Sequence, residues 1–299
     1  MRVDRVVFPE RSWQVKHYRH ADGKKPEKCL QQRYIAMLGQ EVIGHGYYTQ
    51  LEWSYESGKF FISIKILPEY QGQGFGREFF SYLLTELKNY EPSKLEAYTR
   101  ENKVRAIRFL KDRGFKEIGR EWEVELKLDE FEIEKFVNTV DKVRDRGYSL
   151  TTLAELKINE SLIRQLYELI EEANYDIPSS VKYTGVDYES FKSSFGQLPG
   201  FYPPGYIIAF KDEIPVGIST HYKRPDESTL YVKLTGVKRE HRKRGLATAM
   251  KVKAAEMAKG EGFKSITATN ETKHEAILYI NEKIGYERTP AWLSFARDL

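Results

Sequence analysis

The first half of the chain alternates between runs of β-branched and aromatic residues and segments in which apolar residues recur at helical spacing. Turn formers such as Gly39 and Gly58 separate the first three runs, which predicts consecutive antiparallel strands. Two helices and two further strands follow, and the second helix should end at Gly114, because glycine favours the position after a helix. The predicted strands cover 33–37, 42–49, 60–67, 95–99 and 122–128, and the predicted helices cover 74–87 and 103–113.

The second half repeats this order after an opening strand over 148–153 and a helix over 161–174. The stretch from Tyr175 to Tyr206 is rich in aromatic residues, prolines and glycines. A loop-rich segment of this length is uncommon unless it covers a site, so we expect it to line a substrate pocket, or else to pack as a satellite core. The other predicted strands are 206–210, 216–222, 229–234, 265–269 and 293–296, and the other helices are 245–259 and 276–283.

An internal repeat relates the two halves, because residue n in the first matches residue n+171 in the second. The match runs without a gap over 66–115 and pairs Gly74 with Gly245. A repeat of this length indicates one fold used twice. Together with the length of 299 residues it predicts two domains, 1–146 and 147–299, and an apolar stripe over 133–146 predicts a helix that connects them. Each domain is expected to have an α/β (α+β) fold with a mixed, largely antiparallel central sheet flanked by helices.

In each half a strand runs into a glycine-interrupted loop that opens directly into a helix. The two loops are Gln71-Gly72-Gln73-Gly74-Phe75-Gly76 and Arg242-Lys243-Arg244-Gly245-Leu246-Ala247. The first turn of a helix leaves backbone N–H groups unpaired at the positive end of the helix dipole, so both loops predict an anion site. Neither loop has the pattern of an ATP-binding P-loop or the spacing of a dinucleotide site. We therefore expect a compact polyphosphate ligand.

Composition narrows the class of protein. The chain is 40% hydrophobic and 31% charged, which is typical of a soluble globular protein, and its net charge of +4 is too small to indicate nucleic-acid binding. No apolar run reaches the ~18 residues that span a bilayer, and the chain does not start with an apolar signal core, so we expect a cytoplasmic protein without membrane contact. Cys29 is the only cysteine and is expected to be structural, and no metal site is expected.

At these loops the chain resembles the GNAT superfamily of N-acetyltransferases, whose pattern is Arg/Gln-x-x-Gly-x-Gly/Ala. Gln71, Gly74 and Gly76 match it once, and Arg242, Gly245 and Ala247 match it again. The second half is also similar to tandem GNAT proteins of the mycothiol synthase type, and the similar segments are 176–178, 235–237, 242–247, 267–270 and 280–286. The resemblance implies two tandem GNAT folds, acetyl-CoA as the co-substrate and catalysis in the C-terminal half.

The resemblance also implies roles for individual residues. The backbone N–H of Val237 would polarise the thioester carbonyl. The implied acetyl-CoA-binding residues are Val237, Arg242, Lys243, Arg244, Gly245, Leu246, Ala247, Thr248 and Asn270 in the second half, and Ile66, Gln71, Gly72, Gln73, Gly74, Phe75, Gly76 and Arg77 in the first. Many members carry a tyrosine, four residues before the glycine that ends the last helix, to protonate the CoA thiolate. Leu110 and Asn281 hold that position here, so we expect the first half to be weak in catalysis.

Acetylation of an amine also requires a group that accepts a proton. The candidates are Asp176, His221, Tyr222 and His241, and the sequence does not decide among them, although His241 belongs more naturally to the phosphate loop. The predicted catalytic residues are Val237, Asn281 and Asp176.

The predicted function is transfer of an acetyl group from acetyl-CoA to a primary amine of a small molecule or peptide. Two other classes stay open: a non-enzymatic CoA-binding regulatory protein and a tRNA-dependent aminoacyl transferase. The expected partner is the amine acceptor, with no nucleic acid and no membrane, and the chain is expected to act as a monomer or homodimer.

Overall fold

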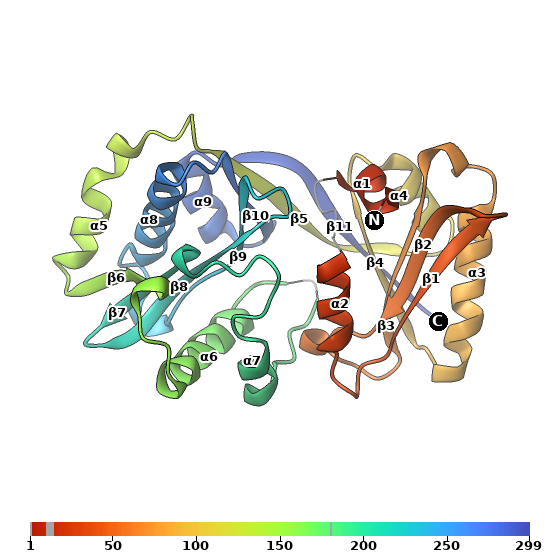
Figure 1. Cartoon of the computed structure of the whole chain (residues 1–299), viewed down its shortest axis with the longest axis horizontal. Coiled ribbons are helices and arrows are strands. Elements are labelled where there is room, and N and C mark those ends of the chain that lie inside the picture. The colour runs from red at the N-terminus through yellow and green to blue at the C-terminus, as the bar shows by residue number, and fades with distance from the viewer. Residues whose placement is uncertain (1, 10–14, 180) are drawn as a thin grey trace. The chain divides into compact units, whose positions relative to one another are not determined.

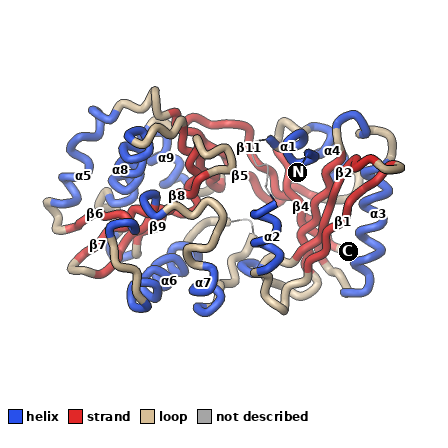
Figure 2. The backbone as a smooth tube through the Cα atoms, viewed as in Figure 1, coloured by secondary structure: helices blue, strands red, loops and turns tan. Residues whose placement is uncertain are grey.

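The computed structural model describes residues 2–9, 15–179 and 181–299, in which helices alternate with strands (Figures 1 and 2). The chain forms two compact units, and each is assembled from more than one stretch of sequence. The first unit comprises Met1–Arg120, Ser180–Thr184 and Trp292–Leu299, and the second comprises Glu121–Ser179 and Gly185–Ala291. The predicted division into 1–146 and 147–299 stays a prediction.

The first unit is a mixed sheet with helices packed against it. Strands β1, β2 and β3 pair antiparallel, and β3 pairs parallel with β4. The strands are β1 (Gln31–Leu38), β2 (Glu41–Thr49), β3 (Lys59–Ile66) and β4 (Lys94–Arg100), and the helices are α1 (Arg2–Val7), α2 (Val15–Gly23), α3 (Phe75–Leu87) and α4 (Val104–Lys111). The core forms where α3 packs Phe79, Phe80 and Leu83 against Phe60 and Leu95 of the sheet.

The second unit repeats this plan with an additional first strand. The ladder β6-β7-β8-β9 is antiparallel, and β9 pairs parallel with β10. The strands are β6 (Tyr148–Thr152), β7 (Tyr206–Lys211), β8 (Ile214–Lys223), β9 (Thr229–Val237) and β10 (Ser265–Glu271), and the helices are α5 (Val137–Arg144), α6 (Glu160–Tyr175), α7 (Tyr188–Ser194), α8 (Leu246–Gly260) and α9 (Glu275–Ile284). In Figure 1, α8 and α6 cover opposite faces of this sheet. These two sheets confirm the expected fold class.

The connecting helix, which begins with a 3-10 turn at Ile133–Phe136 and continues as α5, belongs to the second unit and packs against α8. Among the described residues, no helix is both long and apolar enough to cross a membrane. Cys29 is buried in the first unit.

The closing strands differ from the prediction, because each one ends up in the other unit. We expected 122–128 to complete the first half and 293–296 to complete the second. Instead, β5 (Lys116–Lys127) pairs with β10 from Glu121 onward, and β11 (Glu287–Asp298) pairs with β4 from Trp292 onward. Alternating apolar residues identify both segments as strands, but the two repeats offer equivalent edges, so the pattern alone does not fix the partner.

In both units the parallel pair of strands diverges after a few residues. Strand β9 pairs with β10 only up to Val232 and Ala268, and then each continues separately to its end. In the first unit the parallel pairing of β3 with β4 stops at Phe61 and Glu96. The strand that leads into the glycine-rich loop therefore has no strand partner on that edge over its last residues, and we call the region between the two diverging strands the opening of that unit.

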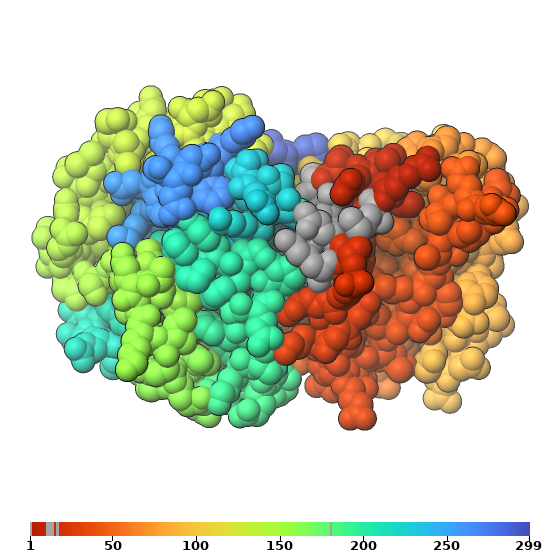
Figure 3. All heavy atoms as spheres, in the orientation of Figure 1, coloured from red at the N-terminus to blue at the C-terminus, as the bar shows by residue number. Residues whose placement is uncertain are grey.

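The aromatic-rich stretch is partly helical and partly core. It contains α7, which lies on the visible green surface of the second unit in Figure 3, and a 3-10 turn at Pro203–Gly205. Tyr202 is buried with Phe263, and Phe201 packs beside Tyr206 at a ring distance of 5.0 Å. For Tyr202 the satellite-core alternative therefore holds.

Candidate active site

The loop of the second unit connects β9 to α8 through a 3-10 turn at 239–241. Gly245 caps α8 in a left-handed conformation with φ of 88°, which strains any other residue. The Nε–H of Arg242 donates to Val237 O at 2.9 Å, and Arg244 Nη2 donates to Glu240 O at 3.0 Å. These side chains fix the course of the loop, and the first backbone N–H groups of α8 point out along the helix axis.

The loop of the first unit is built in the same way. Gln71 Nε2 donates to Ile66 O at 2.8 Å, and Gln73 Nε2 donates to Glu69 O at 2.8 Å. Gly74 caps α3 with φ of 98°. Each of these contacts lies 171 residues before its counterpart, so the repeat extends to individual hydrogen bonds.

The structure brings most of the predicted acetyl-CoA-binding residues together in two groups. Residues 242–248 lie on the second loop and the first turn of α8, and residues 71–77 lie on the first loop and the first turn of α3. Asn270 lies in β10 beyond the point where it leaves β9. One predicted donor is occupied, because the Arg77 N–H already bonds to Gly74 O at 2.9 Å.

Val237, predicted to polarise the thioester, presents its backbone at the opening. The N–H of the next residue, Lys238, donates to Val216 O of β8 at 2.9 Å. Successive backbone groups of a strand point to opposite sides, so the N–H of Val237 points away from β8 and toward the opening. The Val237 carbonyl follows the same direction, since it accepts from Arg242 rather than from β8.

Asp176, predicted to be catalytic, braces the loop. Its Oδ2 accepts from Arg239 Nε at 2.8 Å, and it also pairs with Arg242. The hydrogen bond from Arg239 is the main cause that lowers the pKa of this carboxyl to about 2. A carboxylate held by two guanidinium groups is a weak proton acceptor, so this geometry favours a positioning role.

Replacement of Asp176 by Asn tests that role. We expect kcat to fall by less than about tenfold, because general-base catalysis contributes on the order of 10²- to 10⁴-fold and should not be lost. Instead, the KM for acetyl-CoA should change, because Arg239 and Arg242 lose the carboxylate with which they pair. Steady-state kinetics between pH 6 and 9 provide the measurement, and a kcat loss above about a hundredfold that is steepest at low pH would restore Asp176 as the base.

Asn281, predicted to be catalytic, lies four residues before Gly285, which follows α9. It is buried in α9, and its Nδ2 donates to Asn270 Oδ1 at 2.7 Å. Among the described residues its Oδ1 has no hydrogen-bond partner. Leu110 at the equivalent place in the first unit is part of the hydrophobic core. At this position the second unit therefore has a polar side chain, whereas the first unit has an apolar one.

The other base candidates have structural partners. Burial, followed by the nearby charge of Lys251, lowers the pKa of His221 to about 4, and His221 Nδ1 lies 2.8 Å from Gly205 O. Burial raises the pKa of Tyr222, whose hydroxyl bonds to that of Tyr206. His241 contacts the Tyr148 hydroxyl at 3.0 Å, beneath the loop. Each of these three groups therefore already has a hydrogen-bond partner within the protein.

Side chains of the first unit cross its own opening. Phe8 lies 5.5 Å from the ammonium of Lys65 in β3 and 5.4 Å from that of Lys103, which follows β4. Its ring also stacks on Trp292 at 5.6 Å. Lys65 in turn pairs with the buried Asp4 of α1. In the second unit the residue that corresponds to Lys65 is a glycine, so the two openings differ in what fills them.

The sequence interpretation missed two lysines in the second unit. Lys233 lies in β9 directly after its last pair with β10, and Lys251 is buried inside α8. A signal for each was present, since a lysine interrupts the run 229–234 and another lies on the apolar side of the helix 245–259.

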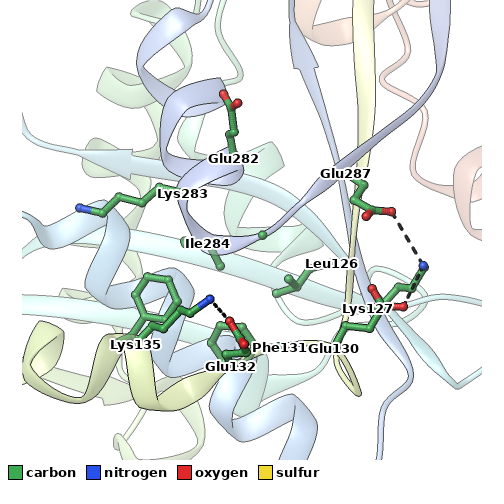
Figure 4. A pocket seen from close by; sticks show the side chains of 12 residues that line it. Leu126, Lys127, Glu130, Phe131, Glu132, Lys135, Glu282, Lys283, Ile284 and Glu287 are labelled. Carbon is green, nitrogen blue, oxygen red and sulfur yellow. Dashed lines mark hydrogen bonds and ion pairs between the residues drawn. The ribbon is translucent and has the colours of Figure 1, made fainter.

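The pocket of about 270 Å³ in Figure 4 lies elsewhere in the second unit. Charged side chains that pair with one another, such as Lys135 with Glu132, surround an apolar floor that includes Leu126, Phe131 and Ile284. None of its lining residues belongs to the loop or to the opening. No group of three or more potential metal ligands occurs among residues 2–9, 15–179 and 181–299.

Comparison with known proteins agrees with this geometry. The model of the acetyltransferase (GNAT) family matches residues 3–115 and 163–286. No curated protein matches the sequence. The second half's similarity to mycothiol synthase stays a prediction.

Solved structures share the fold at low sequence identity. A tandem GNAT protein from the clavulanic acid biosynthesis pathway superposes with a TM-score of 0.75 at 15% identity, over 98% of this chain and 92% of its own. A GCN5-related N-acetyltransferase from Sphaerobacter thermophilus superposes with a TM-score of 0.63 at 16% identity, over 86% of this chain and 77% of its own. A glucosamine N-acetyltransferase region of a fungal β-N-acetylglucosaminidase gives 0.68 at 11% identity, over 99% of this chain and 36% of that one. With matches in both halves, the chain belongs to the acetyltransferase (GNAT) family as a tandem protein.

Proposed function

We propose that the protein transfers an acetyl group from acetyl-CoA to a primary amine of a small molecule or peptide, and that the second unit performs the turnover. The observation that carries this proposal is the continuity of β9. The strand diverges from β10 after Val232, borders the opening as far as Val237, and then enters the anion-binding loop. A long ligand with a pyrophosphate at one end and a thioester at the other fits that order of features.

The pyrophosphate would lie on the backbone N–H groups of Leu246 and Ala247 at the start of α8, beside the cationic Lys243 and Arg244. The pantetheine arm would follow the exposed edge of β9 into the opening. The N–H of Val237, which points to that edge, would stabilise the oxyanion that forms when the amine attacks the carbonyl.

The expected asymmetry between the units rests on three contrasts. Phe8 and Lys65 cross the opening of the first unit. Leu110 is apolar where Asn281 holds a hydrogen bond in the second. The second loop also carries three cationic residues, 242–244, where the first has none. A unit can bind acetyl-CoA without turning it over, because the anion-binding loop supplies affinity, whereas the rate of transfer requires groups placed around the reacting carbonyl.

Calorimetric titration with acetyl-CoA, followed by a thiol-release assay over a panel of primary amines, tests the function. We expect saturable binding and amine-dependent release of free CoA thiol. Binding without release by any amine would favour the non-enzymatic regulator. Absence of binding, together with transfer from a charged tRNA, would favour the aminoacyl transferase. Tertiary amines of similar size serve as the control, since they cannot form a stable amide.

A further inference from the structure

Lys233 lies at the apex of the opening in the second unit. In the ladder between β8 and β9, Thr220 pairs with Leu234 and His221 pairs with Val232, so Lys233 is the extra residue of a β-bulge. Val232 is also the last residue of β9 that pairs with β10. Bulges redirect side chains and are frequent beside functional sites. Lys233 therefore sits at an irregularity in the pairing of β9 with β8, directly after the point where the pairing of β9 with β10 stops.

The surroundings of Lys233 are aromatic. Its ammonium lies 5.5 Å from the ring of Tyr222, whose hydroxyl bonds to that of Tyr206. Phe201 packs edge-on against the same tyrosines, at 5.0 Å from Tyr206 and 6.4 Å from Tyr222. This cluster packs on the face of the sheet that α6 covers, opposite α8.

The ammonium of Lys233 lacks a counter-ion. Within the described parts of the chain it forms no ion pair and no hydrogen bond, although its side chain is exposed to solvent. Burial among the neighbouring groups nevertheless lowers its pKa. An ammonium without a protein partner, at the point where two strands separate, can form a charge-assisted hydrogen bond to an anion that arrives from solution.

We propose that Lys233 binds the carboxylate of the acetyl acceptor, so that the acceptors are amines that also carry a carboxylate, such as amino acids. This inference rests on the proposed function, because it places the acceptor at the same opening. The single positive charge of the Lys233 ammonium balances the single negative charge of a carboxylate. Arg224, which follows β8, is already paired with Glu123 at 3.3 Å.

Binding measurements test the role of Lys233 without requiring turnover. The probes are L-amino acids and their decarboxylated amines, for example phenylalanine with phenethylamine and leucine with 3-methylbutylamine. Each is titrated calorimetrically into the full chain in the presence of saturating CoA. We expect at least one amino acid to bind about tenfold or more tightly than its matched amine, because hydrogen bonds to charged groups are the strong ones.

The variant Lys233→Met should abolish that preference, and Lys233→Arg should retain most of it, because both lysine and arginine supply a positive charge. Lys264→Met is the matched control, since Lys264 is an exposed lysine in the same unit. The proposal is overturned if no amino acid is preferred by the natural chain, or if the preference survives in Lys233→Met.

Turnover separates this proposal from a role of Lys233 as general base. Arginine cannot accept a proton, so a base role predicts that Lys233→Arg loses kcat with every amine. Carboxylate binding instead predicts that Lys233→Met has a raised KM for amino acids and an unchanged kcat/KM for simple amines. A collapse of kcat in Lys233→Arg would refute carboxylate binding as its task. If no thiol is released although the carboxylate preference is present, the transferase proposal fails and the binding site stands.

Discussion

Replacement of Ala247 by Glu should remove acetyl-CoA binding from the second unit and reduce turnover by at least about a hundredfold, because loss of a principal transition-state or substrate-positioning contact has effects of this order. Ala247 lies in the first turn of α8. A carboxylate there takes the place of the pyrophosphate on the backbone N–H groups and repels it. A negative charge in this turn also favours the helix dipole, so the variant should fold.

The matched variant in the first unit is Gly76→Glu, at the corresponding position of α3. A Cβ at Gly76 would lie 3.5 Å from the Phe109 ring, an ordinary contact. We expect this variant to lower the stoichiometry of acetyl-CoA binding at most and to retain substantial kcat. Gly245 and Gly74 are poorer targets, because their positive φ angles would add backbone strain to the effect of the charge.

Calorimetric titration with acetyl-CoA and steady-state thiol release distinguish the outcomes. The variants Ala247→Gln and Gly76→Gln are the controls, because glutamine has the size of glutamate without its charge. Loss of activity in Gly76→Glu together with survival in Ala247→Glu would show that the active unit is assigned backwards. Equal loss in both would show that turnover needs both loops.

The repeat predicted the place of both loops, because its offset of 171 aligns Gly74 with Gly245 and Gln71 with Arg242. The structure adds that the two glycines are left-handed caps and that the two side chains bond to the preceding strand. The reason is physical: a short connection between a strand and a helix has few backbone solutions, and the residues that permit them are specific.

The pairing of the closing strands could not be predicted in the same way. Val124 and Leu126 of β5 are buried in the core of the second unit, and Leu293 and Phe295 of β11 are buried in the core of the first. Each strand has the apolar alternation that either unit requires. Where two edges accept the same pattern, the choice depends on connections and twist that local sequence does not specify.

The environment of individual side chains at the site was not predictable from the sequence, for a related reason. The interpretation of Asp176 depended on residue type, whereas its environment depends on Arg239 and Arg242, which approach it only in the folded chain. Lys233 is an ordinary strand residue in sequence and acquires its significance from a bulge. Charge environment is a property of the tertiary structure, so it becomes visible only after the fold is known.

Replacement of the buried Lys251 by Met should stabilise the protein at neutral pH. Lys251 is 1% exposed within α8, and its ammonium lies 5.1 Å from the ring of Tyr286. Among the described residues it has no ion pair, and the Tyr286 hydroxyl has no hydrogen-bond partner. Burial lowers the pKa of Lys251 to about 7. Methionine has a similar volume and needs no solvation, so it should fit with little rearrangement.

The sign of the pH dependence follows from the two pKa values. The lysine pKa is about 10.4 in an unfolded chain. Between about pH 7 and that value the unfolded state binds the proton more tightly, so the free energy of unfolding rises with pH by at most about 1.4 kcal/mol per unit. Below about pH 7 the folded lysine is also protonated, and its contribution stops changing. His221, with its pKa lowered to about 4, adds a further loss of stability as the pH falls below the ordinary histidine value.

Urea unfolding of the natural chain and of Lys251→Met at pH 7, 8 and 9 provides the measurement, with Lys253→Met, a half-buried lysine in the same helix, as the control. We expect Lys251→Met to raise the free energy of unfolding by about 4 kcal/mol at pH 7, and the difference to shrink toward pH 9 because the natural chain gains stability there. Removal of the Lys251 charge should also raise the pKa of His221, which NMR titration can follow. If the free energy of unfolding depends on pH in the same way in the natural chain and in Lys251→Met, and the pKa of His221 is unchanged, the folded protein keeps the Lys251 ammonium solvated.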